Sequence, residues 1–276
     1  MSVRYLIKLK LTLGVSMSDL DFDYGAELAE STGVKRYNPE VGPQFGVIKS
    51  IIHMGKCPVS FGNTTKAPVN KVCIVIEMKG NLLEADNDEY ISGLHPETGE
   101  PLDGSVSINL NKGDTAALTK FMNAVITKKE NDAGTVKSFD QIIGRPIGFD
   151  VVGSKEKDED GKPKYVDIKN IVAVPALIKP QVPALKNAGV GHCRLSQLTK
   201  EAVLSTHMLF DVMNGMMKSE EWKSGTHPAI ALIEEIRKEQ PKYATAKASD
   251  DKPTESGTGA NKPAAETEQV DSTEEF

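Results

Sequence analysis

The chain has 276 residues, 39% hydrophobic and 26% charged side chains, and a formal net charge of −6. This is the composition of an ordinary globular protein, long enough for one large domain or two small ones. No run of about 18 or more apolar residues occurs, so we expect no transmembrane helix.

The charge is distributed unevenly. Residues 249–276 contain eight acidic and two basic side chains, which accounts for the whole net charge, so the preceding part is neutral. Residues 35–80 carry seven basic and two acidic side chains, whereas residues 81–104 carry seven acidic and no basic ones. A basic stretch beside an acidic tail indicates a polyanionic partner, and a solvated surface of uneven charge is the alternative.

Residues 1–44 are predicted to be an N-terminal extension and a loop. The segment Met17-Ser18-Asp19-Leu20 looks like a natural protein start, so we hypothesise that residues 1–16 are an upstream extension and not native. The loop contains Lys35, Arg36 and Tyr37, two cations beside an aromatic ring. Such a trio suits phosphate contacts combined with base stacking. Alternatively, the tyrosine covers the neighbouring domain.

Residues 45–178 are predicted to form the main domain. Apolar residues alternate in several segments, and one segment between them has helical spacing. The predicted elements are strands at 45–54, 71–79 and 105–110, a helix at 115–129, and strands at 146–152 and 165–174. The alternation slips near Asn170, which predicts a bulge. This chain order is that of the OB-fold. We therefore expect an OB-fold-like five-stranded barrel with a helix between its third and fourth strands.

The predicted loop 55–70 joins the first two strands and holds Lys56, Phe61 and Lys66 among Gly, Asn and Pro residues. In OB-folds this loop lines the binding cleft, so Phe61 is a candidate for base stacking, with packing on the barrel as the alternative. Further candidates for the groove come from the strands and their entrances: Phe45, Lys49, Lys71, Arg145, Lys164, Tyr165 and Lys169.

Two other features allow more than one interpretation. The acids of the insertion 80–104 include Glu84, Asp86, Asp88 and Glu89, which a metal-dependent nuclease would use, but a solvated loop is favoured because no scaffold fixes them. His53 with Cys57 and Cys73 could in principle contribute to a zinc site. Because no Cys-x-x-Cys pair occurs, we favour buried apolar roles, and we predict no metal and no cofactor. The odd, widely spaced cysteines fit a reducing, cytoplasmic compartment.

The C-terminal part divides into two regions. Residues 179–242 are predicted to be helical, with helices at 197–218 and 228–239 that pack on the main domain, and Trp222 fixing the turn between them. A Met-rich surface for a partner is the alternative. Residues 243–276 are disordered by composition. Their end is acidic with a terminal aromatic ring, which suits docking to a basic pocket. The predicted docking residues are Asp271, Glu274, Glu275 and Phe276.

An OB-like core followed by an acidic tail ending in Glu274-Glu275-Phe276 resembles single-stranded DNA-binding proteins, especially those of bacteriophages. The segments 144–148 and 161–165 look like the last hairpin of such proteins. The resemblance implies sequence-tolerant binding of single-stranded DNA in phage DNA replication, recombination and repair, in the host cytoplasm. It also implies recruitment of polymerase, primase, helicase or nuclease through the tail.

The sequence leaves other functions open. A protein-interaction or virion-associated module without DNA binding is one alternative, and a single-strand annealing recombinase is another. An enzyme is not expected, because the chain has no Gly-rich phosphate loop, no Gly-x-Ser-x-Gly and no His-Glu-x-x-His. A homodimer is compatible with the sequence, and no membrane partner is expected.

Overall fold

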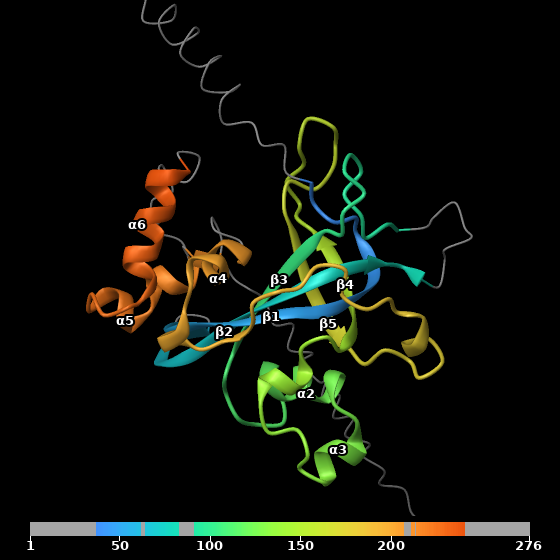
Figure 1. Ribbon diagram of the computed structural model, residues 1–276, viewed down its shortest axis with the longest axis horizontal. Helices are drawn as coiled ribbons and strands as arrows, with labels where there is room; N and C mark the ends of the chain where they lie inside the picture. Colours follow the sequence, from blue (N-terminus) through green and yellow to red (C-terminus); the bar gives the residue numbers. More distant parts are fainter. Residues whose placement is uncertain (1–36, 62–63, 83–90, 207–210, 213, 241–276) are drawn as a thin grey trace, which may run out of the picture.

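The computed structural model of the protein describes residues 37–61, 64–82, 91–206, 211–212 and 214–240. At its centre lies a sheet of six strands (Figure 1). The strands are β1 (Gly42–Phe61), β2 (Thr64–Gly80), β3 (Asp103–Asn109), β4 (Pro146–Gly153), β5 (Val166–Val172) and β6 (Gly191–Cys193). Five of them pair antiparallel in the order β3-β2-β1-β4-β5, and β6 pairs parallel with β1.

The sheet has buried side chains on both faces at β1 and β2. On β2, Val72 and Ile74 belong to one apolar cluster, whereas Cys73 and Val75, which alternate with them, belong to another. Alternate residues of a strand point to opposite faces, so each cluster occupies one face. The second set is buried as well, because the C-terminal region covers that face.

The first face is covered by α2 (Ala117–Val125), which inserts Phe121 and Val125 into its cluster. The predicted helix 115–129 ends early, because the chain is extended at Ile126 and Thr127. Thr127 then caps a separate helix, α3 (Lys128–Asp132), through a capping box with Glu130. The short helix η2 (Phe139–Ile142) leads into β4.

The second face is covered by the C-terminal helices, drawn in orange beside the sheet in Figure 1. They are η4 (Leu195–Gln197), α4 (Lys200–Ser205), η6 (Met216–Lys218), α5 (Glu220–Lys223) and α6 (Ala229–Glu239); the short helix η3 (Lys179–Gln181) precedes them in the chain and is not part of this cover. Ile233, Ile236 and Met216 join Ile52 and Val75 of the sheet in one cluster. The prediction that this region packs on the main domain is confirmed. The helix expected at 197–218 is instead several short helices, while α6 matches its prediction.

A strap, residues 184–193, crosses this face before the helices. The carboxylate of Glu77, which is completely buried, accepts the backbone N–H groups of Lys186 at 2.8 Å and Asn187 at 3.0 Å. The ammonium of Lys79 also contacts Glu77 and donates to the Ala184 carbonyl at 2.8 Å. Burial pushes the pKa of Glu77 upward, but these donors outweigh burial and leave the pKa below its usual value.

The expectation of a mainly β structure with helices is confirmed, but the sheet of the described residues is not closed into a barrel. The path of hydrogen-bonded strands ends at β3 and β5, and β6 is a strand that the sequence did not predict. The predicted bulge near Asn170 is present. That residue has a positive φ of 51°, and the pairing of β4 with β5 shifts there.

Three further observations concern a membrane-spanning helix, the cysteines and a metal site. Among the described residues, no helix is long and apolar enough to cross a membrane. Cys57, Cys73 and Cys193 are all buried as free thiols in the cluster beneath the C-terminal helices. Burial raises the pKa of the Cys57 thiol to about 11. In the part of the chain that is described, no three metal-ligating side chains come together.

Candidate nucleic-acid interface

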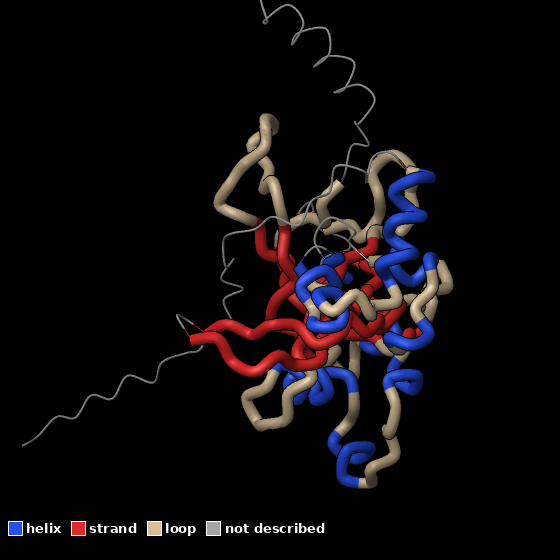
Figure 2. Tube along the Cα trace, turned by 90° about the vertical axis from the view of Figure 1, so that its left-hand side faces the viewer, coloured by secondary structure: helices blue, strands red, loops and turns tan. Residues whose placement is uncertain are grey.

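The first two strands continue beyond the rest of the sheet as a two-stranded ribbon. Pairing runs from Gly55 opposite Lys71 to Phe61 opposite Thr64, and the ribbon projects from the body (Figure 2). We call residues 55–71 the arm. The sequence predicted a loop here because of its Gly, Asn and Pro content. Pro58 lies at a register shift between Cys57 and Val59, where a residue without a backbone N–H is tolerated in a strand.

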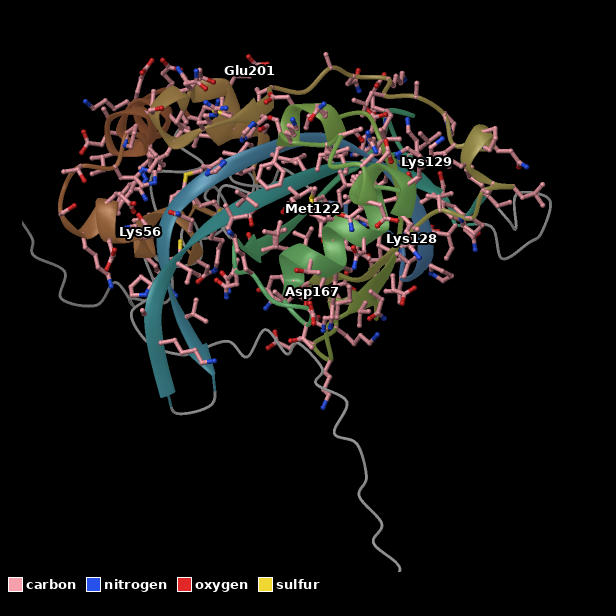
Figure 3. The ribbon with its side chains drawn as sticks, turned by 90° about the horizontal axis from the view of Figure 1, so that it is seen from below. Lys56, Met122, Lys128, Lys129, Asp167 and Glu201 are labelled. Atoms are coloured by element: carbon pink, nitrogen blue, oxygen red, sulfur yellow. The ribbon has the colours of Figure 1, made fainter. Side chains whose placement is uncertain are left out.

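All charged side chains of the arm are basic. No acidic residue occurs between Glu40 and Glu77. Lys56 and Lys66 are exposed on the arm, and Lys71 is half-buried at its root. Figure 3 labels Lys56 near the point where the ribbon leaves the C-terminal helices. Exposed lysines on a ribbon whose own sequence contains no acid attract phosphates, which release their counterions, so the arm suits a polyanion.

Phe61 is the last residue of β1, so its backbone lies at the end of the arm, opposite Thr64. Its side chain lies outside the part that is described. The predicted stacking role of Phe61 therefore stays a prediction, and its place at the arm's tip is compatible with it.

Two candidate nucleic-acid contacts on β1 have structural roles instead. Phe45 is only 8% exposed and lies over Gly148 of β4, so its ring is not available to stack on a base. The Nζ atom of Lys49 lies 2.6 Å from the Asp103 carboxylate on β3, and its side chain is 13% exposed. Phe45 and Lys49 therefore leave the set of candidate contacts, because the ring of Phe45 is buried against β4 and the ammonium of Lys49 is paired with Asp103.

Arg145 also has an internal role. Its guanidinium pairs with Glu130 at 3.0 Å and donates to the carbonyls of Gln141 at 3.0 Å and Val125 at 3.3 Å. The backbone N–H of Thr127, together with Arg145 and the Thr127 hydroxyl, lowers the pKa of Glu130 to about 2. These bonds join α2, α3 and η2 and favour a structural role for Arg145, while its predicted phosphate contact stays a prediction.

Three candidates lie on the β4–β5 hairpin, near the opposite end of β1 from the arm. Tyr165 is 59% exposed, and the Lys164 ammonium lies 5.5 Å from the centre of its ring. Lys164 and Lys169 are exposed and have acidic neighbours at 3.7 Å (Glu156) and 3.8 Å (Asp167). These residues remain available to a ligand, but they do not form one site with the arm.

The remaining candidates are near or beyond the ends of the described part. Tyr37 bonds through its hydroxyl to Glu97, and its ring packs edge-on against His95 with centroids 4.3 Å apart. This favours the covering role that was the alternative for Tyr37. Lys35 and Arg36 lie outside the described residues, as do the predicted docking residues Asp271, Glu274, Glu275 and Phe276.

Lys128 and Lys129 are exposed on α3, well apart from Lys56 of the arm (Figure 3), and they are not part of the proposed contact. Sequence reasoning missed residues that support the arm. Glu221 and His227 contact the root of the arm. Nothing in the sequence pattern indicates those two contacts, because they join segments far apart in the chain.

Comparison with family models, with curated proteins and with solved structures found no match to the chain.

Proposed function

We propose that the protein binds single-stranded DNA with little sequence preference, and that the arm is its main contact. The observation that carries this proposal is the exposure of Lys56 and Lys66 on a projecting ribbon whose sequence contains no acid. The lysines would neutralise phosphates, and Phe61 at the tip would stack on a base. Stacking of one base on an aromatic side chain contributes about 1–3 kcal/mol.

The arrangement of the sheet supports an OB-like interpretation. The chain order of three strands, a helix and two strands is that of an OB-fold, which is partly open in many members. A Cβ added to Gly104 of β3 would lie 2.8 Å from Ile168 Cδ1 of β5, so the two end strands approach each other. We propose an open OB-like sheet whose first two strands are extended into the arm.

The acidic tail is proposed to recruit replication proteins such as a polymerase, primase, helicase or nuclease. This role is non-enzymatic and belongs in the cytoplasm of the cell in which the DNA is replicated. Removal of residues 271–276 should leave the affinity for DNA unchanged or higher, because the tail's acids compete with phosphates for the basic arm. Loss of DNA binding on truncation would contradict this assignment.

The test is fluorescence anisotropy with a labelled oligo-dT at two salt concentrations, for the full chain and for a chain stopped before Asp271. Binding that weakens as salt rises, and that is equal or tighter without the tail, supports the proposal. Failure of both chains to bind at low salt contradicts it. That result would favour a protein-interaction module.

A further inference from the structure

The root of the arm is a place where a ribbon can bend. The pairing of β1 with β2 shifts between His53 and Gly55 and again between Cys57 and Val59. Gly55 has a positive φ of 89°, a conformation that favours glycine. Bulges of this kind bend a strand and change its twist, and a two-stranded ribbon alone is only marginally stable. The direction of the arm therefore depends on what holds its root.

One segment of the C-terminal region, residues 215–227, contacts this root at three successive points. We call it the clamp. The carboxylate of Glu221 accepts the backbone N–H of Lys56 at 2.8 Å. The Cys57 thiol donates to the Gly215 carbonyl at 3.3 Å. The Nε2 atom of His227 lies 3.2 Å from the Met54 carbonyl oxygen, to which it donates.

The clamp and the root are in direct contact, without intervening space. A Cβ added to Gly55 would lie 2.6 Å from Glu221 Oε2 and 2.9 Å from Ser219 Cβ. A Cβ added to Gly215 would lie 1.8 Å from the terminal methyl carbon of Met54. Both glycines thus permit the two segments to approach closely, and the clamp limits the movement of the root.

The clamp is itself fixed in position. The Ser219 hydroxyl caps α5 by accepting the Trp222 N–H at 3.1 Å. The Glu221 carbonyl accepts the backbone N–H groups of Thr226 at 2.8 Å and His227 at 2.9 Å. The Nδ1 atom of His227 accepts the Ala229 N–H at 3.0 Å, which leaves Nε2–H free to donate to Met54. Glu221 and His227 are therefore presented to the root in defined orientations.

We propose that the clamp sets the direction of the arm, and that Glu221 is a positioning residue for binding of single-stranded nucleic acid by the arm. This inference rests on the proposed function. On charge alone, a carboxylate beside the backbone of Lys56 opposes phosphate binding. Its contribution is instead geometric, because it satisfies a backbone donor where the pairing of the ribbon is shifted.

The charge and the hydrogen bond of Glu221 can be separated by two substitutions. Glu221→Gln removes the charge but keeps an oxygen that accepts the Lys56 N–H, and Glu221→Ala removes both. Glu220→Gln is the matched control, since it removes the same charge from the neighbouring exposed residue of α5. Each variant is made in the full chain, and its fold is verified by circular dichroism and thermal unfolding.

Two readouts are measured for each variant: anisotropy with labelled oligo-dT, and amide hydrogen exchange of residues 55–71. The proposal expects Glu221→Ala to weaken DNA binding about tenfold, as for loss of a hydrogen bond to a charged group, and to accelerate exchange in the arm. Glu221→Gln should stay close to the unaltered chain in both. Tighter binding by both Glu221 variants would overturn the proposal, because Glu221 would then act only through its charge.

The exchange measurement also separates this inference from the proposed function. If the unaltered chain binds no oligonucleotide, the proposed function fails, and the clamp is judged on exchange alone. Faster exchange in the arm of Glu221→Ala, but not of Glu220→Gln, then supports the clamp. Unchanged exchange in Glu221→Ala overturns it, whatever the result with DNA.

Discussion

The imidazole rings of His53 on β1 and His192 on β6 share a hydrogen bond, with their Nε2 atoms 3.1 Å apart. The other ring nitrogen of His192, Nδ1, lies 3.2 Å from the Asp140 carboxylate. With His192 donating to Asp140, its Nε2 is the acceptor and His53 is the donor. This chain of bonds joins the strap to β1 and η2, and only one of the two facing Nε2 atoms can carry a proton.

The histidine pair predicts a pH dependence of stability. Burial, followed by the charges of His192 and Arg194, lowers the pKa of His53 in the folded protein. At a pH below about 6.5, the usual histidine pKa, the unfolded chain therefore binds more protons than the folded protein does. The free energy of unfolding falls as the pH drops through that value. The decline per group is at most about 1.4 kcal/mol for each pH unit.

Urea unfolding at pH 7.5 and pH 5.5 measures this effect. The free energy of unfolding should be lower at the acidic pH, and His53→Gln should reduce the difference. It should not abolish the difference, since burial also lowers the pKa of His227. An unchanged pH dependence in His53→Gln would show that His53 does not titrate as described.

Glu77 is predicted to be the main anchor of the strap. Glu77→Gln keeps the shape of the side chain but removes the charge that accepts two backbone N–H groups and pairs with Lys79. Hydrogen bonds to a buried charged group contribute about 1.5–3 kcal/mol, and we expect a loss of that order in the free energy of unfolding. The measurement is equilibrium denaturation in urea.

Glu100→Gln is the matched control for Glu77, because Glu100 pairs with Lys186 of the same strap at 3.0 Å but is exposed. Exposed ion pairs contribute little, so the control should unfold nearly like the unaltered chain. Similar losses in both variants would mean that the buried carboxylate has no special role.

Arg145 is predicted to act on stability and not on nucleic-acid binding. Arg145→Ala removes the ion pair with Glu130 and two hydrogen bonds to carbonyls, so the melting temperature should fall by a few degrees. The affinity for oligo-dT and its dependence on salt should not change. A smaller salt dependence in Arg145→Ala would restore Arg145 as a phosphate contact.

Part of the fold was predictable because it depends on local patterns. The alternation of Val72 and Ile74 identified β2, the slip near Asn170 identified the bulge, and Pro228 identified the start of α6. The sequence of β2 also indicates that the second face of the sheet is buried, but the alternation of Val72 and Ile74 drew attention to one face only. Cys73 and Val75 are apolar too, and a continuous apolar run is typical of a strand buried on both faces.

The site was less predictable because tertiary contacts decide which of its basic side chains are paired with an acid. Lys49 and Arg145 look like free cations in the sequence, but each pairs with an acid that folding brings beside it. Sequence spacing does not show such pairs, since Lys49 and Asp103 are far apart in the chain. The arm was misread as a loop because local propensity favoured turns, whereas pairing with the facing strand keeps it extended.

A charge reversal on the arm tests whether the arm binds single-stranded DNA. Lys56→Glu/Lys66→Glu is compared with Lys128→Glu/Lys129→Glu, which makes the same change at exposed lysines of α3. Anisotropy with labelled oligo-dT is measured over a series of salt concentrations. The arm variant should bind much more weakly, with a slope of log K against log salt reduced in magnitude by about 1.4, while the α3 variant keeps the slope of the unaltered chain. Equal losses in both variants, or a loss confined to the α3 variant, would contradict binding by the arm.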